Sequence, residues 1–309
     1  MSRKYLVLAI LVVLTLVSLL TGVSSLRGDD LWLLFVSRIP RTAAALLAGA
    51  SLAVAGVIMQ MLSRNRFVEP ATAGTGQAAA LGLVAITLVV PGAAIWLKMA
   101  ASTVTALIGT AGFLAIVRRL PRRDPLMVPL TGIVYGGILG ALTTFLAYER
   151  DLLQYIDVWM TGEFSGVMLG RYEFLWIGGV LTIAAYLYAD RFTIAGLGEE
   201  ASTSLGLDHR QIMALGLAIV SIVTAITVVT VGMIPFVGLV VPNIVARVMG
   251  ENLRSTLPVV AVSGAGLVLA CDILSRILRY PFEVPVGTVL GVLGAAIFLW
   301  LLNGRAARG

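Results

Sequence analysis

The sequence predicts an all-α polytopic membrane protein with about ten transmembrane helices. Of its 309 residues, 59% are hydrophobic and only 12% are charged, and the mean hydropathy is +0.99. Soluble domains carry about 25% charged residues, so the composition excludes a water-soluble globule. The charged residues gather in short intervals, and the uncharged runs between them have roughly the 20 residues that cross a bilayer. We expect a single transmembrane domain over residues 1–309.

The uncharged runs locate the expected spans. These lie at residues 5–23, 42–63, 78–97, 99–117, 126–148 and 174–189, two of them within 211–246, and at 257–274 and 284–303. Residues 149–173 are too polar to span, and their glycine-broken apolar centre predicts a short interfacial or re-entrant helix. The run at 211–246 is long for one span and holds Pro235 and Pro242, so it is expected to cross and return part of the way.

The N-terminal run has two interpretations. Arg3 and Lys4 before an apolar stretch are typical of a signal peptide. The stretch is long for such a peptide, however, and residues 21–26 offer no A-x-A cleavage site. We therefore expect a retained first span.

The basic residues predict the orientation. With a cytoplasmic N-terminus, 14 of the 22 Lys and Arg residues fall in inside loops. This bias follows the positive-inside rule, and it places both termini in the cytoplasm of a bacterial cell membrane. The polar interval at 194–211 then faces the cytoplasm as well.

That interval contains a short pattern of interest. Residues 200–206 read EASTSLG, an acid and small residues followed by a glycine that can end a helix in the left-handed conformation. The pattern predicts a short helix and a bend exposed to water. An ordinary solvated loop is the alternative, because polar loops between spans are common.

Small residues predict close helix contacts in lipid. The segment AGASLAVAG at 48–56 permits backbones to approach each other, and Gly132, Gly136 and Gly140 share one helical face. The second set favours helix packing, within the chain or with another subunit. A role in lining a pathway is the alternative.

The sequence offers little for catalysis or metal binding. Its one cysteine, Cys271, excludes an internal disulfide and a thiolate cluster, and its one histidine, His209, is expected to be solvated. There is no G-x-x-x-x-G-K-[ST] phosphate loop, and the only lysines are Lys4 and Lys98. We expect neither a metal site nor a cofactor on this chain.

Two other classes of membrane protein compete with an ATP-driven one. An ion-coupled secondary transporter usually carries ionisable residues within its spans. The uncharged runs contain none, and Asp272 is placed at the end of a span, where a charged turn is expected to continue to Glu283. An intramembrane enzyme would need paired catalytic groups at membrane depth, and the sequence shows no such pair.

Several segments resemble a known family. The signatures are RIPRTAAALLAGASLAVAGVIMQMLSRNRFVEPATAGTG at 38–76, GMIPFVGLVVPNIVAR at 232–247, CDILSRI at 271–277 and PFEVPVGTVLGVLGAAIFLWLL at 281–302. With the 200–206 pattern, which resembles an E-A-A-x-x-x-G loop, they cover most of the chain in the expected order. They resemble the FecCD-type permeases of ABC importers, which include cobalamin and ferric-siderophore importers.

The resemblance implies a ten-span half-transporter that dimerises around a central pathway. It implies two ATPase subunits, which bind ATP and Mg²⁺, and an extracytoplasmic binding protein. Six residues match the loop that docks on the ATPase, namely Glu199, Glu200, Ala201, Ser202, Leu205 and Gly206. Arg38, Arg41 and Arg276 match arginines that bind acidic residues of the binding protein, and exposed like charges would steer such a partner. Snorkelling arginines are the alternative.

The resemblance also implies gates and a substrate class. Trp159, Met160 and Gly162 correspond to the outer gate, and Gln77, Asp124 and Pro125 to the inner one. The family usually has a histidine where Asn243 stands, and often asparagine or serine near Gln77, so the gate details differ here. RFVEPATAGTG and VVPNIV most resemble the ferric-siderophore subgroup, with catecholates as the expected type. Cobalamin or haem is the alternative, and a heterodimer of permeases is favoured over a homodimer.

Overall fold

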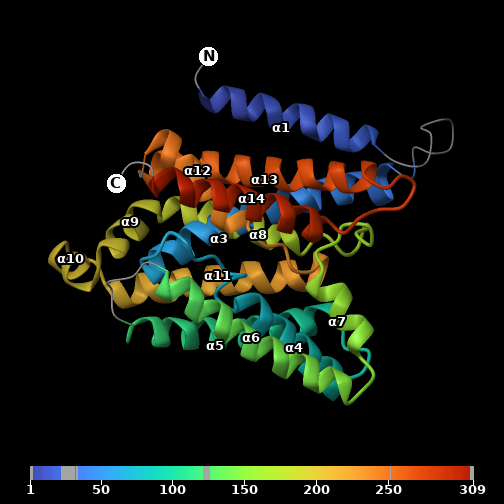
Figure 1. Ribbon diagram of the computed structural model, residues 1–309, viewed down its shortest axis with the longest axis horizontal. Coiled ribbons are helices and arrows are strands. Elements are labelled where there is room, and N and C mark those ends of the chain that lie inside the picture. The colour runs from blue at the N-terminus through green and yellow to red at the C-terminus, as the bar shows by residue number, and fades with distance from the viewer. Residues whose placement is uncertain (1–2, 22–31, 33, 121–125, 251, 307–309) are drawn as a thin grey trace.

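The computed structural model describes residues 3–21, 32, 34–120, 126–250 and 252–306, and their regular elements are all helical. The helices are α1 (Arg3–Leu20), the π-helical turn η2 (Leu34–Arg38), α3 (Ile39–Ser63), α4 (Thr75–Val89), α5 (Ile95–Val117), α6 (Met127–Tyr148), α7 (Leu153–Met160), α8 (Leu175–Leu187), α9 (Ala189–Leu197), α10 (Glu199–Ser204), α11 (His209–Val231), α12 (Val237–Met249), α13 (Leu253–Ile277) and α14 (Val286–Ala306). Most lie side by side with similar directions (Figure 1). The prediction of an all-α fold is confirmed.

The apolar helices correspond to the expected spans. Five are long and apolar enough to cross a membrane, namely η2 with α3, α5, α6, α11 and α13. The pair α8 and α9 passes the same test together, with a bend of 66° between them. The shorter apolar helices α1, α4, α12 and α14 complete the set. The chain is therefore a multi-pass membrane protein.

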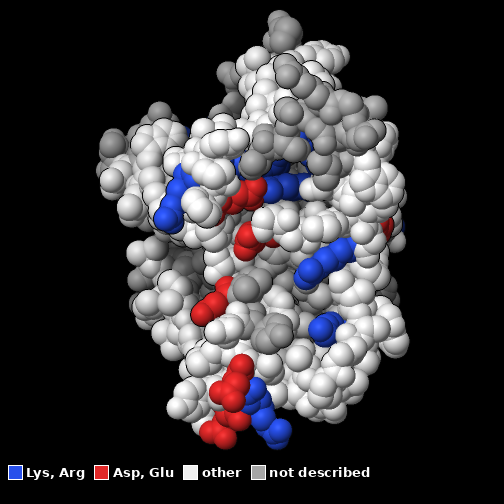
Figure 2. Space-filling model, turned by 90° about the vertical axis from the view of Figure 1, so that its right-hand side faces the viewer, with Lys and Arg blue, Asp and Glu red and all other residues white. Residues whose placement is uncertain are grey.

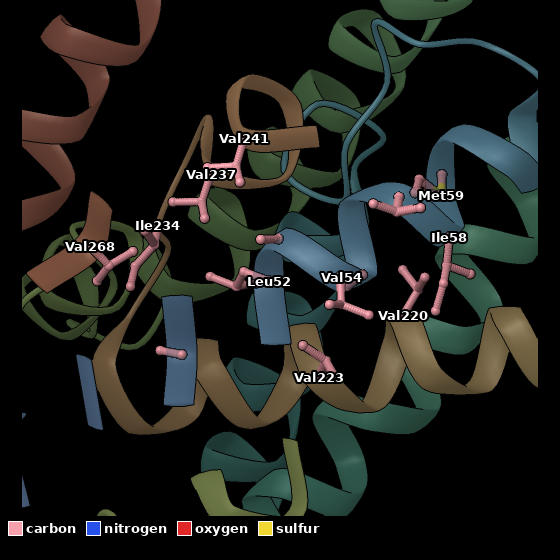
Figure 3. Close-up of a cluster of buried hydrophobic side chains, with 14 of the residues drawn as sticks. Leu52, Val54, Ile58, Met59, Val220, Val223, Ile234, Val237, Val241 and Val268 are labelled. Carbon is pink, nitrogen blue, oxygen red and sulfur yellow. The ribbon is translucent and has the colours of Figure 1, made fainter. Parts of the chain in front are cut away.

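Helix α3 lies at the centre of the bundle. Within its most apolar stretch, 78% of the residues are buried inside the chain. Leu52, Val54 and Ile58 of α3 lie beside Val220 and Val223 of α11 in a continuous cluster of buried side chains (Figure 3). Because α3 also packs against α8, α12 and α13, it is the element that positions the others.

Two glycines of α3 permit this close packing. A Cβ on Gly49 would lie 2.5 Å from the carbonyl oxygen of Gly264 in α13, and one on Gly56 would lie 2.1 Å from that of Gly238 in α12. Real Cβ atoms do not approach so closely, so only glycine fits at either contact. The prediction of close contacts at 48–56 is confirmed.

The boundaries of two expected spans are wrong. The run at 78–97 does not form one helix, because α4 ends at Val89 and α5 begins at Ile95. Pro91 cannot donate a backbone hydrogen bond and Gly92 has a φ of +83°, so a turn forms between the two helices. Lys98 consequently lies inside α5 and not in a turn.

Two polar intervals are also shorter than expected. The interval at 194–211 begins inside α9, which continues to Leu197 after the bend that follows α8. The charged turn expected to start at Asp272 begins only after Ile277, where α13 ends. The α13 helix continues because Asp272 is fully buried and its carboxylate is paired there.

The broken run at 211–246 is as expected. Helix α11 crosses and ends at Val231, and the chain then turns through Gly232 and Phe236, whose φ values are +84° and +68°. Helix α12 returns with only 13 residues. The short helix expected within 149–173 is present as α7, although it lies before the glycine-rich centre of that segment.

Candidate functional site

The two ends of the bundle carry different features. The start of α1, the end of α14 and helix α10 lie at one end, whereas α7 and the turn between α13 and α14 lie at the other (Figure 1). We call these the α10 end and the α7 end.

Helix α10 has the geometry expected for residues 200–206. Gly206 has a φ of +76°, and its N–H donates to the carbonyl of Thr203 at 2.9 Å. The N–H of Leu207 donates to the carbonyl of Ser202, also at 2.9 Å. This pair of hydrogen bonds is a Schellman motif, which satisfies carbonyls at the end of a helix and favours glycine. The predicted short helix with a left-handed glycine cap is confirmed.

Ser202 fixes α10 between its neighbours. Its hydroxyl donates to the carbonyl of Gly198 at 2.6 Å and lies 3.2 Å from Nδ1 of His209, the first residue of α11. Asp208 caps α11 by accepting from the N–H groups of Arg210 and Gln211. His209 is therefore half-buried and hydrogen-bonded, so it is only partly solvated.

The outer side of this turn is open to solvent. Glu199 and Glu200 are exposed and Ala201 is half-buried, while Leu197 and Leu205 are 68% and 63% exposed. A cavity of about 350 Å³ adjoins the turn, and its polar lining comes from Arg118, Glu199, His209 and Arg210. The turn therefore presents two apolar side chains among charged ones.

The three predicted docking arginines lie together at the α7 end, but they are buried. Arg38, Arg41 and Arg276 are 7%, 9% and 7% exposed. Arg41 donates from Nη2 to Oδ1 of Asp272 at 2.8 Å and from Nη1 to Oε1 of Glu283 at 2.9 Å, and Arg276 pairs with Oδ2 of Asp272. The expectation that the arginines are exposed is wrong, whereas their docking role stays a prediction.

Two of these arginines also cap the C-terminal end of α1 by donating to its last carbonyl groups. Arg38 donates from Nη1 to the carbonyl of Leu19 at 3.1 Å, and Arg276 donates from Nη1 to the carbonyls of Ser18 and Thr21, each at 3.1 Å. The last carbonyls of a helix have no partner within it, and cations are stabilised at that end by the helix dipole. Figure 2 shows the α7 end of the molecule, where a few basic and acidic side chains lie among uncharged ones.

The residues matched to the outer gate contact the break between α11 and α12. The N–H of Met233 donates to the carbonyl of Trp159 at 3.0 Å. Gly162 lies against the carbonyl of Met233 and accepts a backbone hydrogen bond from Gly287. Met160 packs beside Trp159 on a small apolar cluster. The structure therefore joins α7 to the start of α14 through residues 231–233.

The residues matched to the inner gate are only partly described. Asp124 and Pro125 lie outside the described residues. Gln77 lies near the start of α4, and its buried Oε1 has no hydrogen-bond partner among the described residues. Its side chain lies against Gly136 of α6.

The glycine stripe of α6 faces the chain's own interior. A Cβ on Gly132 would lie 2.3 Å from the carbonyl oxygen of Thr72, and one on Gly136 would lie 3.3 Å from Cα of Gly74. Gly140 is farther away, and a Cβ there would lie 3.9 Å from Gln77. The stripe thus packs against residues 72–77 of the same chain.

The sequence reasoning missed Glu69. It is 2% exposed, and its Oε1 accepts a hydrogen bond of 2.7 Å from the N–H of Phe236. The sequence did indicate a buried acid here, because Glu69 is the only acidic residue between Asp30 and Asp124 and has apolar neighbours. No group of three or more His, Cys, Asp and Glu side chains that suits a metal occurs among the residues that the structure describes.

In the described part of the chain, nine apolar segments pack with the central helix α3 in one bundle, which defines a multi-pass membrane protein. The chain belongs to the FecCD transport family, whose model matches residues 6–304.

Curated relatives match over almost the whole chain. The petrobactin import system permease protein YclN of Bacillus subtilis is 42% identical, with 99% of each chain covered. The ferric-anguibactin transport system permease protein FatD of Vibrio anguillarum is 42% identical, covering 91% of this chain and 90% of its own. The vitamin B12 import system permease protein BtuC of Yersinia enterocolitica is 33% identical over 95% of this chain and 91% of its own.

The fold also matches a solved transporter. A metal-chelate type ABC transporter in an inward-facing conformation superposes with a TM-score of 0.83 at 24% identity, covering 97% of this chain and 98% of that one. This similarity shows that the chain has the same fold as that transporter.

Proposed function

We propose that this chain is the transmembrane permease subunit of a binding-protein-dependent ABC importer that takes up a ferric siderophore. The observation that carries this is the identity of 42% to permeases of petrobactin and anguibactin systems, against 33% to a vitamin B12 permease. Cobalamin is thus the less supported substrate. A catecholate chelate remains our expected type, and the chelate would cross intact because the sequence suggests no ligand set to strip iron.

We propose that α10 docks on the ATPase. Leu197 and Leu205 are exposed beside the exposed acids Glu199 and Glu200, so the turn offers apolar and charged groups together. The Schellman cap at Gly206 fixes the direction of the chain between α10 and α11. A movement of α10 caused by the ATPase would therefore also move α11. ATP and Mg²⁺ then bind the partner ATPase, and this chain acts as the translocation subunit.

The α7 end would receive the binding protein. The three arginines are buried, and Arg41 and Arg276 are paired with Asp272 and Glu283, so they offer a partner little positive charge directly. The exposed groups beside them are Tyr280 and Phe282, at 64% and 69%, and Arg279, whose guanidinium stacks on Phe282. Acidic residues of a binding protein would meet this surface first.

The remaining assignments follow from this orientation. The α10 end faces the cytoplasm with both termini, and the protein lies in the bacterial cell membrane. We propose that the pathway forms between this chain and a second permease subunit, with a heterodimer favoured over a homodimer.

Purification from native membranes and an uptake panel test the proposal together. Mass spectrometry of the purified assembly should find an ATPase, a binding protein and either one or two permeases. Uptake with labelled chelates should then show a ferric siderophore as the substrate. Transport of cobalamin or haem and of no siderophore would refute the substrate, and gentle extraction without an ATPase would refute the importer.

A further inference from the structure

The N-terminus of α12 lies inside the bundle, away from water. Gly238 contacts Gly56, which precedes the end of α3 by seven residues, or about 10 Å at 1.5 Å per residue. The first N–H groups of any helix have no partner within it. At membrane depth, water cannot satisfy them, so another part of the protein must do so.

Glu69 supplies the missing acceptor. Its Oε1 accepts from the N–H of Phe236 at 2.7 Å, and its other oxygen lies against Gly238, where a Cβ would be 3.3 Å from Oε2. The partial positive charge at the N-terminus of a helix also attracts an acidic side chain at this position. Glu69 is thus a helix cap supplied from 167 residues away in the chain.

The loop that carries Glu69, residues 64–74, is bound to α12 a second time. Nδ2 of Asn243 donates to the carbonyl of Arg66 at 2.8 Å. Glu69 therefore holds the beginning of α12 and Asn243 its middle. The two contacts prevent α12 from sliding along the loop or turning about its own axis.

This loop and α12 together connect distant parts of the molecule. The carbonyl of Thr72 packs against Gly132 of α6, and Phe236 packs against Gly294 of α14. Just before α12, Met233 is hydrogen-bonded to Trp159 at the end of α7. A displacement of α12 would consequently also move the outer segment that contains Trp159 and Gly162.

We propose that Glu69 is the positioning residue that makes loop 64–74 and α12 one rigid unit, and that efficient coupling of ATP hydrolysis to transport requires its carboxylate. The coupling part rests on the proposed function. Without the negative charge, the cap of α12 is weaker, so α12 moves relative to loop 64–74 and less of the ATPase-driven motion reaches the rest of the chain.

The test uses the complete transporter with Glu69→Gln, which keeps the side chain's size and an acceptor oxygen but removes the charge that strengthens the hydrogen bond. Glu173→Gln is the matched control, because Glu173 also accepts a backbone hydrogen bond, from Gly170 at 2.7 Å, but is solvent-accessible at the α7 end. In proteoliposomes, Glu69→Gln should reduce the amount of chelate moved per ATP hydrolysed about tenfold while ATPase turnover persists. Glu173→Gln should leave the ratio unchanged.

A distance measurement separates this inference from the proposed function. With Cys271 replaced by serine, spin labels at Arg66 and Val248 report the separation of loop 64–74 and α12 without any substrate. The distance distribution should be narrow in the parent and in Glu173→Gln, and clearly broader in Glu69→Gln. If Glu69→Gln does not accumulate, Asn243→Leu takes its place. This variant removes only the second contact, and its distance distribution should be broader than that of the parent. An unchanged distribution in the variant that accumulates, or normal coupling in Glu69→Gln, overturns the proposal.

Discussion

Arg41 donates from both Nε and Nη2 to Oδ1 of Asp272, which lies 231 residues later in the chain. Asp272 is fully buried, and its other oxygen is paired with Arg276. One carboxylate therefore balances two buried guanidinium groups, with Glu283 as the second acid. This network fixes α1, α3 and α13 to one another at the α7 end.

Removing the charge of Asp272 should strongly destabilise the protein. Asp272→Asn leaves two buried arginines with too little countercharge, and breaking a buried pair typically costs about 3–5 kcal/mol. Thermal unfolding in detergent measures the loss. Asp190→Asn is the control, because Asp190 pairs with Arg254 at an exposed site, where water and salt screen the attraction and little stability is lost. Similar melting temperatures for the two variants would contradict a stabilising network.

Gly206→Arg should abolish ATPase association and leave the protein in the membrane. No heavy atom lies within 4 Å of the position of a Cβ on Gly206, so the new side chain projects from the end of α10 into the docking surface. The left-handed backbone adds about 1–2 kcal/mol of strain. Co-purification of the ATPase measures the effect. Gly170→Arg, at an equally open glycine with a φ of +90°, carries the same strain at the α7 end and should retain the ATPase. Retention by both variants would argue against α10 as the docking element.

Gly56→Ala should loosen the contact between α3 and α12. The added methyl would overlap the backbone of Gly238, and overpacking of this kind costs about 1–3 kcal/mol. Gly137→Ala in α6 is the control, because its Cβ meets nothing within 4 Å and alanine favours a helix by about 1 kcal/mol over glycine. Melting temperatures should therefore move in opposite directions. A rise for Gly56→Ala would mean that the two helices are not in close contact.

Gln77→Met should separate a gating role from a packing role. Since Oε1 of Gln77 has no partner among the described residues, its replacement should change the free energy of unfolding little. Gln60→Met is the comparison, because Nε2 of Gln60 donates to the carbonyl of Gly238 and loss of such a bond costs about 1 kcal/mol. If Gln77 belongs to the inner gate, chelate uptake should change in a protein of normal stability. Normal uptake by Gln77→Met would remove it from the gate.

The fold class and the short helix at residues 199–206 could be predicted because both depend on local patterns. A span is a run of apolar residues, and a glycine cap needs only the residues beside it. The same reasoning failed at residues 90–94, where a proline and a glycine produce a turn inside a run that is apolar throughout. Hydropathy does not register such a turn, because it averages over residues and ignores backbone conformation.

The sequence by itself determined that this protein spans a membrane many times, which motifs it carries, and that it lacks a phosphate loop. Only the tertiary structure decided how its few charges are used. Arg41 and Asp272 are distant in the sequence, as are Glu69 and Phe236, and each pair meets only when the helices pack. The physical reason is that a buried charge is stable only beside its partner, and the sequence shows which charges exist but not which are neighbours.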